Sequence, residues 1–227
     1  MRKFSLLGLV AVGSVLFTSL ASATPVTGTA NIAGTVNVNT GGVFFTNTMI
    51  PGPNEGSFAG ATSATLKNLV GAPTTGAVSI PAFATFTVPT GNVTFDLQNI
   101  FAGAGTVGGC GSNTVGNVCT PANSPFTLIQ AAPGQVTITL ALSGIAYTGT
   151  AASGSSPAPF SFSTQNTLPG TITGILAAVN TDGGFTNSYS ATLTAESPSA
   201  VPEPASCLLM GAGLLAAGLV SRRKVRS

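Results

Sequence analysis

The sequence predicts an all-β fold, an antiparallel β-sandwich of Greek-key or jelly-roll type, between two short apolar end segments. First, the helix-forming residues Leu, Glu, Lys and Arg are scarce over residues 24–195, where Thr, Val, Ser, Gly and Asn dominate. Second, several stretches alternate apolar and polar residues, as half-buried strands do. Third, turn sequences rich in Pro, Gly and Asn separate these stretches at intervals of about ten residues, a spacing typical of sandwiches.

The alternation defines three clear strands, over residues 135–142, 93–97 and 189–194. In the first, every second residue from Val136 to Leu142 is apolar and the threonines fall on the other face. Weaker strands are predicted at 32–38, 43–46, 82–88, 126–130, 145–148, 160–163 and 171–179, of which the last could instead be a short helical turn. The Ser-, Gly- and Pro-rich residues 151–159 are predicted to form a long surface loop.

Phenylalanine supplies much of the predicted core, because the chain has 13 of them and most lie in the body. A Phe-lined ligand groove is the alternative interpretation. Tyr147 and Tyr189 could stack on sugar rings, but two tyrosines without any tryptophan give such a surface little support. The phenylalanines assigned to the core are Phe44, Phe45, Phe58, Phe83, Phe86, Phe95, Phe101, Phe126, Phe160, Phe162 and Phe185.

Charge and histidine content exclude several classes of function. Between residues 24 and 200 the only cation is Lys67, so there is no basic cluster to bind a nucleic acid. The chain has no histidine, which excludes Ser-His-Asp and Cys-His catalysis and zinc sites that need imidazole. The four acids of this region, Glu55, Asp96, Asp182 and Glu196, are far apart in sequence and form no evident carboxylate pair. We therefore expect no enzyme activity, no cofactor and no metal site.

Cys110 and Cys119 enclose a short loop of glycines and small polar residues. In an oxidising compartment this pair is expected to form a local disulfide that pins a hairpin or an Ω-like loop, with two free thiols as the alternative. Cys207 lies in the apolar C-terminal segment and is interpreted as a small membrane residue.

Residues 1–23 have the three parts of a secretory signal peptide in the expected order. Arg2 and Lys3 form a positive start, residues 4–20 are apolar, and Ala21 and Ala23 match the small-x-small pattern that signal peptidase cuts. Cleavage after Ala23 would leave a body of residues 24–195 that is exported; an uncleaved N-terminal anchor is the alternative.

The C-terminal segment, residues 201–227, follows a short spacer at 196–200. It begins with Val201-Pro202-Glu203-Pro204, whose two prolines exclude a helix interior and favour an extended, exposed stretch. Residues 205–221 carry no charge and are expected to form a transmembrane helix, about 24 Å long over its 16 most apolar residues. The cations that follow should remain on the cytoplasmic side; they are Arg222, Arg223, Lys224 and Arg226.

This order of Pro-Glu-Pro, short apolar helix and arginine-rich end closely resembles the PEP-CTERM sorting signal of Gram-negative bacteria. The alternative is an ordinary anchor behind a chance Pro-Glu-Pro. The resemblance implies export across the inner membrane, transient anchoring, cleavage by an exosortase-like enzyme, and release to the cell surface or beyond. It also implies an association with exopolysaccharide and biofilm growth. For the body we expect a structural role in the matrix, or else a binding module for polysaccharide or another surface component.

Overall fold

The computed structural model describes residues 25–71, 73–164, 169–181, 183–197 and 211–213. Contacts divide the chain into two units, Met1–Glu196 and Ser197–Ser227, and the first contains the folded body. The signal-cleavage residues Ala21 and Ala23 lie outside the described residues. So do the whole sorting motif and all the C-terminal cations.

The body is built almost entirely from antiparallel strands, as the alternation of its sequence predicts. Four short helices interrupt them among the described residues: η2 (Gly56–Phe58), η3 (Val107–Gly111), η4 (Ala151–Ser153) and α1 (Ile172–Val179). The strands are β1 (Gly28–Asn39), β2 (Gly42–Met49), β3 (Ser63–Leu66), β4 (Leu69–Val70), β5 (Gly76–Val88), β6 (Gly91–Ile100), β7 (Val118–Cys119), β8 (Thr127–Ala132), β9 (Gln135–Thr148), β10 (Ser155–Thr164) and β11 (Phe185–Ala195).

The strands form one curled sheet rather than two separate sheets, so the predicted Greek-key or jelly-roll connections are wrong. The main order is β3-β5-β6-β9-β10-β11-β1-β2-β4, with β7 and β8 paired beside the first half of β9. Consecutive long strands therefore pair with each other, and β11 returns to pair with β1 from Gly28↔Ala195 to Val38↔Phe185. The physical reason is that short turns join most of these strands, and a short hairpin connection places successive strands side by side.

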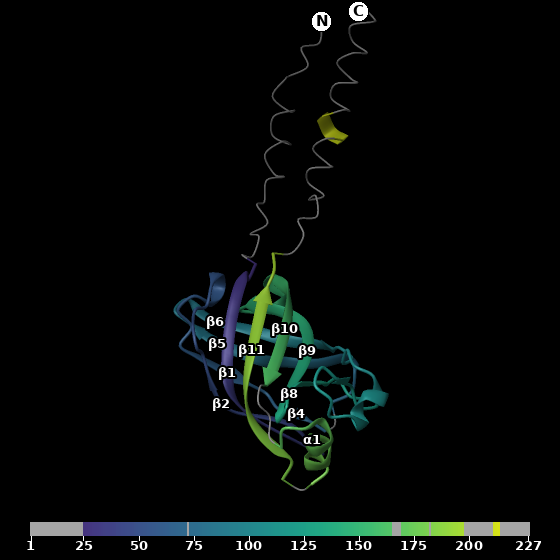
Figure 1. Cartoon of the computed structure of the whole chain (residues 1–227). Helices are drawn as coiled ribbons and strands as arrows, with labels where there is room; N and C mark the ends of the chain where they lie inside the picture. Colours follow the sequence, from purple (N-terminus) through teal and green to yellow (C-terminus); the bar gives the residue numbers. More distant parts are fainter. Residues whose placement is uncertain (1–24, 72, 165–168, 182, 198–210, 214–227) are drawn as a thin grey trace, which may run out of the picture. The chain divides into compact units, whose positions relative to one another are not determined.

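The segment 63–70 connects the two ends of this sheet. Its first half, β3, pairs with β5, and its second half, β4, pairs with β2. Between the two halves, the backbone N–H of Lys67 donates to the Phe83 carbonyl and the Asn68 side chain accepts from the backbone N–H of Phe45. The sheet therefore curls around a single interior, and β5 and β6 lie behind β1, β10 and β11 in Figure 1.

The interior contains the apolar faces that the sequence predicts. Every second residue of β9 from Val136 to Leu142 is buried, as are the corresponding faces of β6 and β11. The rings of Phe45, Phe83, Phe95, Phe160 and Phe162 make edge or tilted contacts with centroids 4.5–6.3 Å apart. We call the buried side chains inside the curl of β1, β2, β5, β6, β9, β10 and β11 the main core.

Three local predictions need correction. Residues 155–159 belong to β10 and not to a surface loop. Proline has no backbone N–H, but Pro157 and Pro159 fit in this strand because their pairing with β9 requires no N–H donor from them. Residues 171–179 are the N-cap and helix α1, which confirms the helical alternative. Phe101 is 45% exposed and so lies outside the core, because the chain leaves the sheet directly after β6.

A second, smaller hydrophobic cluster lies under α1. It consists of Cys119, Leu128, Val136, Ile138, Ile172, Ile175 and Phe185, and we call it the α1 cluster. Figure 1 shows α1 near the start of β11, at the opposite end of that strand from the point where the chain leaves the body.

Within the described residues, no helix combines the length and apolar character needed to cross a membrane. Of the expected transmembrane segment, residues 211–213 are described, and they are helical. The rest of that segment lies outside the described residues, so the transmembrane helix stays a prediction.

Candidate functional site

The disulfide expected between Cys110 and Cys119 is present, with Cα atoms 4.9 Å apart. It joins η3 to β7 and so ties the loop before β8 to the α1 cluster, in which Cys119 is fully buried. Asn117 reinforces the same loop, because its side-chain amide donates to the carbonyls of Gly109 and Ser112. The bond is therefore part of the scaffold of this end of the molecule.

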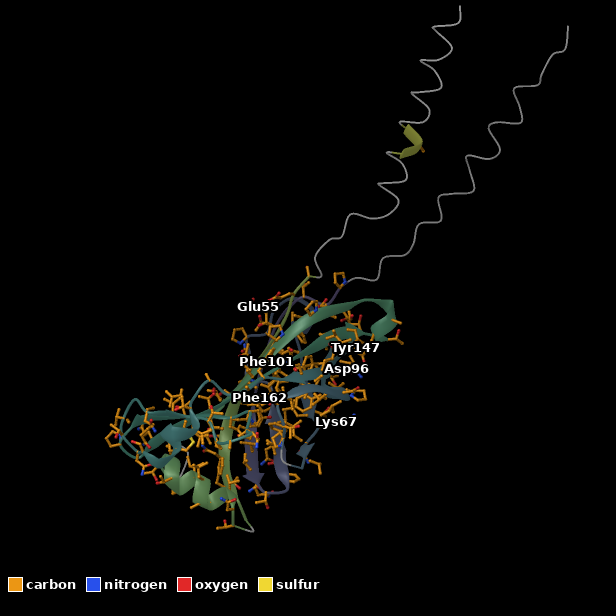
Figure 2. All side chains as sticks on the ribbon, turned by 90° about the vertical axis from the view of Figure 1, so that its right-hand side faces the viewer. Glu55, Lys67, Asp96, Phe101, Tyr147 and Phe162 are labelled. Atoms are coloured by element: carbon orange, nitrogen blue, oxygen red, sulfur yellow. A yellow bond between two sulfur atoms is a disulfide. The ribbon has the colours of Figure 1, made fainter. Side chains whose placement is uncertain are left out.

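Of the four acids considered at first, Asp96 has the most developed surroundings. Its Oδ1 accepts hydrogen bonds from the backbone N–H of Ala82 at 2.6 Å and from the Tyr147 hydroxyl at 3.0 Å, and Figure 2 shows Asp96 and Tyr147 adjacent. Partial burial, together with the hydrogen bond to Asp96 and its charge, raises the pKa of Tyr147. Ala82 has a positive φ of 49°, a strained conformation for alanine. The two hydrogen bonds of Asp96 Oδ1 stabilise an irregular point of β5 and occupy this oxygen.

The two tyrosines considered as sugar platforms have different surroundings. Tyr189 is only 3% exposed, and its ring packs against Phe45 and Phe162, so it belongs to the main core and cannot stack on a ligand. Its hydroxyl lies 3.2 Å from that of Thr48. Tyr147 is partly exposed on β9 and holds Asp96. Alternation alone placed Tyr189 on the buried face of its strand, which excludes it from a surface platform.

The described residues contain no group of three or more Asp, Glu, Cys or His side chains able to hold a metal ion. Asp182 lies outside the described residues, and Glu55 and Glu196 are near the end of the body where β1 begins and β11 finishes. Glu55 and Glu196 thus lie at the same end of the body, whereas Asp96 is engaged by Ala82 and Tyr147.

A pocket of about 480 Å³ lies between α1, the start of β11 and the loop before β8. Its floor is apolar and includes Leu128, Ile138 and Phe185. Leu176 and Val179 of α1 form one wall, and residues 121–126, which include Pro121 and Pro125, form another. Among the described residues, no charged side chain lines it. Asn39, Asn123 and Asn180 contribute amides to the lining.

A smaller void lies next to this pocket, on the side of the curled sheet's interior. This void of about 30 Å³ shares Val38, Phe126, Ile138 and Phe185 with the pocket and reaches Phe45, Phe162 and Tyr189 of the main core. The α1 pocket, as we name the larger cavity, therefore lies where the main core and the α1 cluster meet. Sites at the mouth of a curled sheet commonly bind small molecules.

The helix wall of the α1 pocket is fixed by side chains that satisfy its first backbone N–H groups. Ile172 donates to Gln130, Thr173 to Asn113 and Gly174 to the N-cap Thr171. Gln130 is 1% exposed, and its amide also donates to the carbonyls of Ala132, Gln135 and Gly170. One buried amide thus joins the β8–β9 hairpin to the start of α1.

The outer face of β9, β10 and β11 carries short hydroxyl side chains in register. Ser161 pairs with Thr192 and Ser163 pairs with Ser190, and a shallow groove of about 260 Å³ lies over these residues. The Thr192 hydroxyl also donates to the Asn31 side chain on β1 at 3.2 Å. This hydroxyl face is uncharged across its whole width.

Sequence reasoning missed both the α1 pocket and the role of Gln130. The pocket joins residues from 38 to 185, and no local pattern reveals which loops meet. The sequence did contain an indication for Gln130, because this polar residue interrupts an apolar strand. A buried side-chain amide in such a position needs hydrogen-bond partners.

Residues 200–224 match the family model for the PEP-CTERM protein-sorting motif. No curated protein and no solved structure matches the chain. The match confirms the interpretation of the Pro-Glu-Pro segment and its apolar and cationic continuation. It supports an exported protein that associates with the membrane and is sorted by an exosortase. It covers the C-terminal segment alone, so it carries no information on the body.

Proposed function

We propose that this chain is an exported, non-enzymatic surface or extracellular-matrix protein of a Gram-negative bacterium, whose body serves a structural role in exopolysaccharide-rich biofilm. The single observation that carries this proposal is the sorting motif at residues 200–224, which supports export and exosortase processing. The tail then acts as a temporary anchor until cleavage at Pro202-Glu203-Pro204 releases the body.

The surface of the body supports a structural role. Its exposed strand faces carry Ser, Thr and Asn, and in the described part of the body the charged residues are Glu55, Lys67, Asp96 and Glu196. Such a surface presents many uncharged hydrogen-bonding groups to the surrounding matrix. The curled, Phe-filled interior provides rigidity.

The sorting proposal is tested by replacing Pro202-Glu203-Pro204 with three alanines. We expect export to continue but an uncleaved, membrane-retained form to accumulate, because the apolar segment stays while the recognition element is lost. Intact mass of the released and retained forms measures both cut sites. The matched control replaces Ser197-Pro198-Ser199 with alanines, which should leave processing unchanged. Release of mature protein of the normal size from the first variant would contradict the proposal.

A second candidate function is binding of a polysaccharide on the hydroxyl face, favoured by the groove over Ser161, Ser163, Ser190 and Thr192. Affinity electrophoresis of residues 24–200 in gels containing the host's own polysaccharide distinguishes the two. Binding would retard the body, and Ser163→Val with Thr192→Val would remove the retardation, while Thr29→Val on β1 serves as the control. A purely structural body migrates alike with and without polysaccharide.

A further inference from the structure

The α1 pocket has the size of a small-molecule site. Ligand pockets in proteins commonly enclose about 300–1,000 Å³, and this one encloses about 480 Å³. An apolar group of the size of a medium-length chain can therefore be accommodated beside α1.

The lining determines the charge of a ligand. None of the described side chains that line the cavity is charged, and the charged residues of the described part of the body lie elsewhere. A carboxylate or phosphate entering here would lose its hydration without gaining an ionic partner, which is strongly unfavourable. The lining therefore selects a neutral molecule.

Amide and hydroxyl side chains in the lining of the α1 pocket can form hydrogen bonds with one polar group of a ligand. Asn180 and Asn39 are held in place, since Asn180 donates to the Leu176 carbonyl and Asn39 donates to Asn37. Asn123 and Thr74 also line the pocket. A hydroxyl, ester or amide at one end of an apolar ligand would meet these groups, while its apolar part covers Ile138, Ile175 and Phe185.

The walls are held in position before any ligand binds. The Cys110–Cys119 disulfide fixes Cys119 close to the start of the wall formed by residues 121–126, and Gln130 and Asn113 accept hydrogen bonds from the first turn of α1. Pre-organised walls lower the entropy that a ligand must lose on binding. The pocket also lies at the end of β11 away from Ala195, so its mouth is remote from the segment that leads to the tail.

We propose that the α1 pocket binds a neutral, mostly apolar small molecule with one uncharged hydrogen-bonding group, of the class of a medium-chain alcohol or ester. The body would then carry such a molecule to the exterior or retain it there. This inference is independent of the sorting proposal, since it concerns residues 38–185 alone.

Residues 24–200 are used for the test, because every strand, both hydrophobic clusters and the disulfide lie between residues 26 and 195. The probe is N-phenyl-1-naphthylamine, a neutral dye that fluoresces in apolar surroundings, with 1-decanol and decanoate as competitors at pH 8. We expect saturable binding of the dye with one site per body. 1-Decanol should displace it at concentrations at least about tenfold lower than decanoate, because only decanoate carries a charge.

Two variants on α1 locate the site. Val179→Glu places a carboxylate in the lining and should weaken dye binding at least about tenfold, whereas Ala177→Glu, on an exposed position of the same helix, should leave it unchanged. Leu176→Trp gives a reporter in a chain that has no tryptophan, and its emission should shift on addition of 1-decanol. Ala177→Trp should not respond. Circular dichroism checks that each variant is folded.

Three outcomes would overturn the proposal. The first is no saturable dye binding together with no shift in the emission of the Leu176→Trp variant. The second is equal competition by decanol and decanoate, or equal binding by the two Glu variants. The third is a dimer in sedimentation velocity that Val179→Glu dissociates, because the α1 pocket would then be an interface between copies of this chain.

Discussion

The curled sheet fills its interior with phenylalanine rings, whereas the α1 end packs aliphatic side chains around a buried amide and a disulfide. In the main core, rings from β2, β5, β6, β10 and β11 contact one another across the curl. In the α1 cluster, Ile172 and Ile175 pack with Cys119 of the disulfide, and the Gln130 side chain accepts from the Ile172 N–H. The α1 end thus adds a few specific bonds to its buried apolar side chains.

That difference has a consequence for binding. A tightly packed aromatic interior leaves little free volume, since protein cores pack like organic crystals. The α1 end has a short helix and a loop that includes Pro121 and Pro125, and the α1 pocket lies there. This end of the body is thus where a ligand can be accommodated without disturbing the sheet.

The largest expected effect is on the main core. Phe95→Ala removes a fully buried ring that contacts Phe83 and Phe160 and should lower the free energy of unfolding by about 3–5 kcal/mol. Urea unfolding followed by circular dichroism measures it. Phe101→Ala, at an exposed position, is the control and should change stability by less than about 0.5 kcal/mol. Equal effects of the two changes would show that the interior does not depend on its rings.

The next effect concerns the disulfide. Replacing Cys110 and Cys119 with alanine removes a link across nine residues, which should cost about 2–3 kcal/mol by loop-closure entropy. Hydrogen exchange should increase mainly in residues 106–130 and in α1, while β1, β6 and β11 stay protected. Uniform loss of protection across the body would mean that the two regions unfold as one unit, and the comparison between them would fail.

Gln130→Leu tests the buried amide. It leaves the Ile172 N–H and the Gly170 carbonyl without these partners and should destabilise the α1 end by about 1–3 kcal/mol. We expect α1 amides to exchange faster and dye binding in the α1 pocket to weaken. The matched control is Gln135→Leu, an exposed position on β9, which should change neither property. Unaltered exchange in α1 of the Gln130 variant would contradict the role assigned to this residue.

The smallest effect is a dependence of stability on alkaline pH. Burial raises the pKa of Tyr189 above its usual value of 10.0, although the hydrogen bond to Thr48 acts in the opposite direction. The unfolded chain therefore loses this proton first, and stability is complete below pH 10 and declines as the pH rises through the folded pKa, by at most about 1.4 kcal/mol per pH unit.

Tyr189→Phe should flatten that decline between pH 10 and 11 in urea titrations of the body. Tyr147→Phe should alter the slope less, because Tyr147 is more exposed, even though burial and Asp96 also raise its pKa. An unchanged slope in the Tyr189 variant would show that its hydroxyl is not effectively buried in the main core.

Much of the body could be predicted from local patterns. Period-two alternation placed Val93, Phe95 and Leu97 on a buried face, because successive side chains of a strand point to opposite sides. The spacing of Cys110 and Cys119 predicted a local bond, which is present. The Pro-Glu-Pro segment predicted a sorting motif, which the family model confirms.

Other features depend on contacts between distant residues and could not be predicted in this way. The single curled sheet requires residues 63–70 to pair with both β2 and β5. The tolerance of Pro157 and Pro159 in β10 depends on which edge of that strand is paired. Exposure of Phe101 depends on where β6 ends.

The sequence by itself determined the β character of the body, the faces its strands bury, the disulfide and the sorting motif, because each is encoded in residues close together along the chain. Tertiary structure alone decided that the sheet curls on itself, that Tyr147 binds Asp96, and that a pocket forms beside α1. These features arise where segments distant along the chain meet, as β1 and β11 do. Local chemistry restricts each segment to a small set of conformations, and only the packing of all segments together selects their neighbours.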